Sequence, residues 1–78
     1  MMARRHRVHP LVHELRARRL VLGNPQGAVA RLAGLTPHQL RDRETGASKT
    51  TLAEADAIAR ALGMRLVLIT TTDLEGLQ

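Results

Sequence analysis

The sequence predicts a mainly α-helical fold in which four short helices are followed by a single β-strand over residues 64–72. Two observations predict the helices: apolar residues recur at helical spacing in four stretches, and glycine or proline marks the ends of these stretches. A third observation predicts the strand. The run Met-Arg-Leu-Val-Leu-Ile-Thr-Thr is short and rich in β-branched residues, and no other part of the chain has this pattern.

The chain of 78 residues is long enough for one domain, and its composition predicts a small core. Apolar residues make up 44% of the sequence but include no Phe, Trp, Tyr or Cys. Neither aromatic burial nor a disulfide can therefore reinforce the core, and we expect self-association instead. No apolar run is long enough to cross a membrane, and no apolar stretch typical of a secretory signal follows the basic start. The sequence predicts a soluble cytoplasmic protein with no membrane partner.

Positive charge is concentrated in the first part of the chain. Residues 1–49 hold ten Arg and Lys against three Asp and Glu, whereas residues 50–78 hold two against four. A strongly basic region is typical of nucleic-acid binding. Because the chain has no aromatic side chains, it lacks the stacking surfaces of proteins that bind single strands or RNA. Double-stranded DNA is therefore the expected partner.

Residues 1–9 are predicted to form a flexible basic arm in front of a helical domain over residues 10–63. Arg4, Arg5 and Arg7 lie in this arm without any apolar period. We expect these arginines to contact the DNA backbone or the minor groove; the alternative is a disordered arm without function.

The ends of the first two helices are predicted from proline, glycine and asparagine. Pro10 suits the first turn of the first helix, which is expected to end before Gly23. Its inner face is expected to consist of Leu11, Leu15 and Leu22. Asn24 is expected to cap a second helix that has Pro25 at its first position and runs to about Ala33.

Two capping boxes predict the starts of the third and fourth helices. Thr36 and Thr51 are cap residues, and Gln39 and Glu54 follow each of them by three positions. The third helix is expected to run to about residue 44, and the fourth is expected to end at the glycine of residue 63. Residues 73–78 are expected to form a frayed tail.

The spacing of five residues in the middle of the chain is typical of a helix-turn-helix. Ala30 is small enough to let two helices cross closely, Gly34 suits the turn between them, and Leu40 anchors the second of them inward. Together with Gln26 and Glu44, this pattern resembles the lambda-repressor-like family of DNA-binding domains, also called the Cro/cI or xenobiotic-response-element family. The resemblance covers most of the chain and implies a four-helix DNA-binding domain.

Within this family, the chain most resembles the antitoxins that partner Hip-type kinase toxins. The Thr-Thr-Leu at the start of their fourth helix has a counterpart at Thr50, Thr51 and Leu52. Their chains also continue into a strand that pairs across a dimer. The resemblance thus implies a bacterial or phage-encoded, nucleoid-associated protein, a homodimer, and a possible toxin partner.

The resemblance also implies roles for individual residues. Gln26 matches a glutamine that contacts phosphate, and Thr36 matches the cap of the recognition helix. Arg19 and Glu44 match a structural ion pair that joins the first and third helices. The family positions that face base edges are matched by His38, Gln39 and Asp42.

Helical geometry indicates independently which side of the third helix faces DNA. If Leu40 points inward, the step of about 100° per residue places His38 and Asp42 on the opposite side, with Gln39 and Arg41 on the flanks. Base contacts are therefore expected from His38, Gln39, Arg41 and Asp42. Contacts with the DNA backbone are expected from Gln26, Thr36, Arg43, Thr45 and Lys49, besides the arginines of the arm.

Several of these assignments have an alternative. Gln39 cannot read a base if its side chain folds back onto the amide of Thr36. Asp42 can be a solvated charge that repels phosphate, and Arg41 can bind phosphate in place of a base. Arg43 stands where the family usually has an apolar or aromatic residue, so the end of the recognition helix is expected to be looser or to reach a phosphate.

The sequence favours neither a metal site nor catalysis. His9 and His13 have the i, i+4 spacing of a metal clamp, but no carboxylate or thiol is spaced to complete it, and solvated histidines are the favoured interpretation. No phosphate-binding glycine loop, pair of carboxylates or nucleophile–base arrangement is present in the sequence. We expect no enzyme activity and no cofactor.

Two functions remain after these exclusions. The favoured function is a dimeric repressor that binds a palindromic operator. The alternative is an antitoxin, which binds DNA in the same way but also holds a toxin protein and represses its own operon. A protein that coats DNA without sequence preference is disfavoured, because the chain has a defined recognition helix.

The predicted strand lacks a partner in its own chain. Both faces of residues 64–69 are largely apolar, so an unpaired edge here would aggregate. Pairing with the same strand of a second copy about a two-fold axis removes that edge. The dimer interface is expected to consist of Met64, Leu66, Val67, Leu68 and Ile69. The alternative is a fifth helix, which the β-branched residues of this stretch disfavour.

Overall fold

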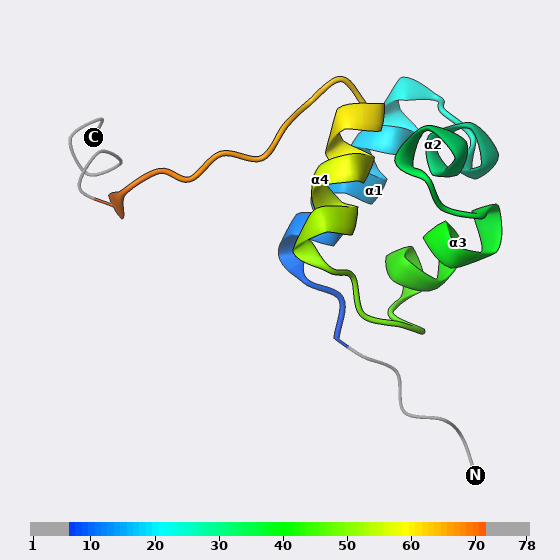
Figure 1. The fold of residues 1–78 in the computed structure, drawn as a ribbon, viewed down its shortest axis with the longest axis horizontal. Helices are drawn as coiled ribbons and strands as arrows, with labels where there is room; N and C mark the ends of the chain where they lie inside the picture. Colours follow the sequence, from blue (N-terminus) through cyan, green and yellow to red (C-terminus); the bar gives the residue numbers. More distant parts are fainter. Residues whose placement is uncertain (1–6, 72–78) are drawn as a thin grey trace, which may run out of the picture.

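The structure, a computed structural model, describes residues 7–71 and confirms the four predicted helices. They are α1 (Pro10–Leu22), α2 (Gln26–Ala33), α3 (Pro37–Thr45) and α4 (Leu52–Ala61). α1 and α2 each pack against both α3 and α4, and Figure 1 shows α4 beside α1 with α2 and α3 on one side of that pair. Within residues 7–71, no helix is long and apolar enough to cross a membrane. The expected arm residues Arg4 and Arg5 and the expected tail over residues 73–78 lie outside the described residues.

A small aliphatic core joins the four helices. Its buried members are Leu15, Val29, Ala30, Leu40, Ala55, Ile58, Ala59 and Leu62. Ala30 and Leu40 are completely inaccessible to solvent, as expected if a small residue allows α2 and α3 to cross closely. The inner face predicted for α1 is partly wrong, because Leu22 is 47% exposed while Val12, which the prediction omitted, is buried. Leu22 is the last residue of α1 and lies beyond the core.

Both predicted capping boxes are present. The Thr36 hydroxyl accepts a hydrogen bond from the Gln39 amide at 3.0 Å, and the Gln39 side chain accepts one from the Thr36 amide at 2.9 Å. Thr51 and Glu54 exchange the same two bonds, each at 3.0 Å, at the start of α4. These bonds satisfy amide groups that have no partner within the helix, and they fix the first turns of α3 and α4.

The predicted start of α2 is wrong by one residue. The helix begins at Gln26, and Pro25 occupies the capping position without a side-chain hydrogen bond. Asn24 does not cap α2 because it belongs to the end of α1: its amide donates to the carbonyl of Arg19 at 3.0 Å. Gly23 makes this ending possible with a left-handed backbone (φ 72°), which a residue with a side chain rarely adopts.

Residues 64–70 form neither a helix nor a strand and extend away from the four helices (Figure 1). The amide of Met64 still donates to the carbonyl of Ala59 at 2.8 Å, and the side chains of Met64 and Leu66 pack against the core. Beyond them, Val67, Leu68 and Ile69 are exposed. The fifth helix considered for this stretch is absent from residues 64–70. A strand needs a neighbouring strand to form a ladder, and residues 7–71 contain none, so pairing across a dimer stays a prediction.

Candidate nucleic-acid interface

The recognition helix α3 is polar on the side opposite its buried residue. Leu40 points into the core, whereas His38 and Arg41 are exposed and Asp42 is half-buried, as the helical geometry predicts. The Nε2 atom of His38 lies 3.4 Å from the Oδ2 atom of Asp42, one helical turn further along. The structure therefore brings together two of the four residues expected to contact bases, on the surface that faces away from the core.

The capping box restricts what Gln39 can contact. Its Oε1 atom accepts the hydrogen bond from the Thr36 amide, as in the alternative considered for this residue. A bidentate contact with adenine needs both Oε1 and Nε2 of a glutamine, so this contact would require the cap to break. In the present geometry, only the Nε2 group is suited to donate to a base or a phosphate.

Arg19 of α1 and Glu44 of α3 form a buried ion pair. The Nε and Nη2 atoms of Arg19 donate to the two carboxylate oxygens of Glu44 at 2.7 and 2.9 Å. The side chains are only 9% and 4% exposed. The remaining Nη1 atom of Arg19 donates to the carbonyl of Asn24 at 3.1 Å. The pair ties the last turn of the recognition helix to α1 and to the loop before α2.

Gln26 also contacts Glu44. Its Nε2 atom donates to the Oε1 atom of Glu44 at 2.8 Å, a bond that the sequence analysis did not predict. Arg16 adds a longer contact, with its Nε atom 3.9 Å from the same oxygen. The Gln26 amide has a second N–H, so the expected phosphate contact is compatible with this bond but is not its only role.

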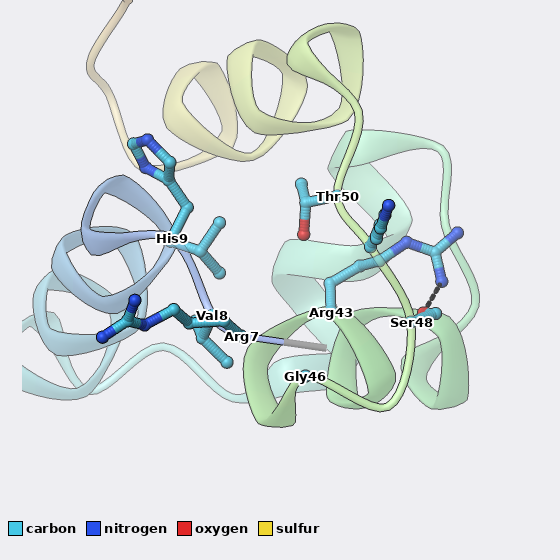
Figure 2. A pocket seen from close by; sticks show the side chains of 9 residues that line it. Arg7, Val8, His9, Arg43, Gly46, Ser48 and Thr50 are labelled. Atoms are coloured by element: carbon cyan, nitrogen blue, oxygen red, sulfur yellow. Dashed lines mark hydrogen bonds between the residues drawn. The ribbon is translucent and has the colours of Figure 1, made fainter. Parts of the chain in front are cut away.

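Arg43 is engaged within the protein, and the phosphate contact expected from the sequence would have to compete with these bonds. Its Nε and Nη2 atoms donate to the two carboxylate oxygens of Glu54 at 3.1 and 3.0 Å, and its Nη1 atom donates to the Ser48 hydroxyl at 2.6 Å. Figure 2 shows the Arg43 guanidinium turned toward Ser48. These three bonds hold the guanidinium within the domain, and the two with Glu54 link the last turn of α3 to the first turn of α4.

The same contacts shift the ionisation of both partners. The hydrogen bonds from Arg43 are the largest cause that lowers the pKa of Glu54 to about 2, and the bond from the Thr51 amide lowers it further. The hydrogen bond with Glu54 is also the largest cause that raises the pKa of Arg43. Both groups are therefore charged at neutral pH. The sequence does not predict this pair, because it assigns Glu54 to a capping box and Arg43 to a phosphate.

The remaining backbone candidates lie at the start of α3 or around the loop after it. Arg7 and Lys49 are exposed and line a pocket of about 320 Å³, together with Val8, Ser48 and Thr50 (Figure 2). Thr36 and Thr45, at the two ends of α3, are also exposed. The structure thus places cationic and hydroxyl groups from the arm and from the loop on one concave surface next to the end of the recognition helix.

His9 lies directly before α1 and has a structural role there. Its Nδ1 atom accepts a hydrogen bond from the Leu11 amide at 3.0 Å and so caps α1. Within residues 7–71, no group of three His, Cys, Asp or Glu side chains is arranged to hold a metal ion.

Three of the five residues expected at the dimer interface border an apolar groove. It has a volume of about 610 Å³ and lies between the starts of α1 and α4 and the extended C-terminal segment. Its lining consists of Leu11, Leu52, Ala53, Asp56, Leu66, Val67 and Leu68. Of the expected interface residues, Leu68 is fully exposed (102%) and Ile69 is 55% exposed.

Comparison with known proteins identifies the family. A helix-turn-helix family model matches residues 15–69, which is more than two thirds of the chain. Searches of curated proteins and of solved structures gave no match. The matched region contains α2, α3 and α4, the buried Arg19–Glu44 pair and most of α1. The chain therefore belongs to the Cro/cI-like helix-turn-helix family, which consists of DNA-binding transcription regulators.

Proposed function

We propose that the protein is a dimeric repressor that binds a palindromic operator in double-stranded DNA. The observation that supports this most is the arrangement of α3. Leu40 and Glu44 hold one side of the helix against the domain, while His38 and Asp42 form the polar opposite side and Arg41 is exposed on its flank. A helix presented in this way can enter the major groove, where each base pair displays a different pattern of donors and acceptors.

Three side chains of α3 have the chemistry to read bases. Arg41 can donate two hydrogen bonds to guanine, and Asp42 can accept one from the amino group of cytosine. His38 lies within 3.4 Å of Asp42 and can orient its carboxylate. Gln39 contributes through its Nε2 group alone while the capping box is intact.

The DNA backbone is proposed to contact groups at both ends of α3. These groups are the side chains of Gln26, Thr36, Thr45 and Lys49, together with Arg4, Arg5 and Arg7 of the basic arm. Arg43 is left out of this set because its guanidinium is bonded to Glu54 and Ser48. Lysine and arginine contacts of this kind determine register and affinity but carry little sequence information.

The dimer is proposed to form through the C-terminal segment. Within residues 65–69, the structure shows no hydrogen bond to the described part of the chain, and three of the side chains are exposed and apolar. Antiparallel pairing with the same segment of a second copy would satisfy the backbone groups and cover these side chains. A two-fold axis would then relate the two recognition helices, which must lie about 34 Å apart to enter successive major grooves.

An antitoxin is the second candidate, and exposed apolar side chains on α1 and α2 favour it. Leu20, Val21 and Leu32 are 52%, 78% and 71% exposed, on α1 and α2. They lie outside the groove next to the C-terminal segment. A partner protein that bound this part of the domain would remove these side chains from water. In this case a toxin protein would bind the domain while α3 reads the operator.

Selection from a pool of random duplexes tests the proposal. We expect the protein to enrich a palindrome, and its affinity for that duplex to fall with a log–log salt slope of about −4 to −5 if five phosphates are contacted. Arg41→Ala should reduce the preference for the enriched duplex over a scrambled one. Arg60→Ala is the matched control, since Arg60 is an exposed arginine of α4 that pairs with Asp56. A flat salt response would refute DNA binding, and an enriched site without two-fold symmetry would refute the dimer.

A further inference from the structure

The recognition helix has few apolar contacts with the rest of the domain. Of the nine residues of α3, only Leu40 and Glu44 are buried, and only the first of these is apolar. One leucine therefore supplies the apolar attachment of the helix that must be placed in the major groove. The other contacts that attach α3 to the domain are ionic and come from its last turn.

Two adjacent residues of that last turn bind in different directions. Successive residues of a helix point about 100° apart, so Arg43 and Glu44 reach different neighbours. Glu44 contacts Arg19 of α1, and Arg43 contacts Glu54 of α4. Because α3 packs mainly against α1 and α2, the second contact restrains the helix on a side where helix packing is weak.

The carboxylate of Glu54 performs two tasks at once. Its Oε1 atom accepts hydrogen bonds from the Arg43 Nε atom and from the Thr51 amide, at 3.1 and 3.0 Å. The Ser48 hydroxyl holds the far side of the guanidinium at 2.6 Å. The Arg43 and Glu54 side chains are 16% and 23% exposed, so the pair is partly shielded from solvent, and its charged hydrogen bonds are stronger than neutral ones.

We infer that Arg43 and Glu54 are positioning residues, which act as an ionic clamp that sets the angle of α3 relative to α4 and thereby aims the base-reading side chains. This inference rests on the proposed DNA binding, and it makes Arg43 important for sequence preference without a contact to DNA. An arginine at the end of a recognition helix would otherwise be assigned to a phosphate.

The test uses a variant that removes the clamp and keeps the helix cap. Glu54→Gln removes the charge that Arg43 binds, but glutamine can still accept the hydrogen bond from the Thr51 amide, because Glu and Gln both serve in a capping box. Asp56→Asn is the matched control, since it makes the same chemical change in the exposed Asp56–Arg60 pair of the same helix. All measurements are made on the full chain, below the melting transitions of the variants.

Two measurements are made on each variant. The first is the ratio of affinities for the duplex enriched by the unchanged protein and for a scrambled duplex. We expect Glu54→Gln to lower this ratio about fivefold to tenfold and Asp56→Asn to change it by less than about twofold. The second is the angle between α3 and α4, measured from NMR residual dipolar couplings of backbone amides. This angle should change in Glu54→Gln only.

A double-mutant cycle separates the clamp from a phosphate contact. If Arg43 acts through Glu54, Arg43→Met should have little further effect in the Glu54→Gln background and should leave the salt slope unchanged. If Arg43 binds a phosphate, Arg43→Met should weaken binding to all duplexes and reduce the slope by about one, which would overturn the inference.

The angle between α3 and α4 tests the clamp even if the protein does not bind DNA. If the unchanged protein enriches no duplex, the proposed function is wrong, and the angle alone decides whether the clamp exists. An angle in Glu54→Gln equal to that in Asp56→Asn would overturn the clamp, whether or not the protein binds DNA.

Discussion

Replacing Glu44 with alanine should destabilise the whole domain. Glu44 accepts three hydrogen bonds, two from Arg19 and one from Gln26, at 2.7 to 2.9 Å. Its carboxylate is 4% exposed, and the side chain of Arg19 is 9% exposed. In Glu44→Ala, the Arg19 guanidinium stays buried with the carbonyl of Asn24 as its remaining hydrogen-bond acceptor.

The expected loss is large compared with the stability of so small a domain. Breaking a buried pair by removing one partner costs roughly 3–5 kcal/mol, because the other charge is left uncompensated. A chain of this length has a free energy of unfolding of about 4–12 kcal/mol. A loss of this size corresponds to a fall in Tm of roughly 12–40 °C. Glu44→Ala is therefore expected to be largely unfolded or to melt far below the unchanged protein.

Chemical denaturation followed by circular dichroism at the helix band measures the effect. Arg16→Ala is the control, since Arg16 is 49% exposed on its side chain and lies 3.9 Å from Glu44, and it should cost less than about 1 kcal/mol. A double variant, Arg19→Met with Glu44→Leu, should recover much of the lost stability because it removes both charges. The reasoning is refuted if Glu44→Ala unfolds within about 1 kcal/mol of the unchanged protein.

Two further predictions concern pH and assembly. The folded pKa of Glu54, about 2, lies below its ordinary value of 4.5, so the bond with Arg43 stabilises the fold above about pH 4.5 and is lost as the pH falls toward 2. The free energy of unfolding of Glu54→Gln should therefore be about 1 kcal/mol lower than that of the unchanged protein at pH 7, and the two should converge near pH 2; a constant difference would contradict this. Val67→Pro removes one backbone donor from the proposed strand and should give monomers with weaker operator binding in sedimentation and binding assays. If this variant sediments as a dimer, the interface lies on the helices.

The helix starts could be predicted because caps are local in sequence. Thr36 with Gln39, and Thr51 with Glu54, need only three residues of chain to form their hydrogen bonds, and each pair is present as expected. The start of α2 could not be predicted in the same way. Asparagine often caps helices, but the backbone amide of Asn24 is bonded to the carbonyl of Arg19 at the end of α1.

The partners of long polar side chains could not be predicted from the sequence. Gln26 is 18 positions from Glu44, and Arg43 is 11 positions from Glu54. Whether such groups meet depends on how each helix is rotated about its axis, and a change of one residue in register moves a side chain by about 100°. The resemblance to the family gave Gln26 a contact with phosphate, and Arg43 departs from the family pattern. The fold gives both residues partners inside the domain.

The absence of aromatic residues connects the composition to the positioning of α3. A domain of this family without Phe, Trp or Tyr has only aliphatic side chains for its core, and α3 contributes one of them. Ion pairs on two sides of its last turn replace the missing apolar contacts. They differ in exposure: the Arg19–Glu44 pair is shielded from solvent, whereas the Arg43–Glu54 pair is partly open to it. Added salt screens exposed charges more than buried ones. Rising salt should therefore weaken the restraint toward α4 while the restraint toward α1 remains, so that sequence preference falls in addition to the general loss of phosphate binding.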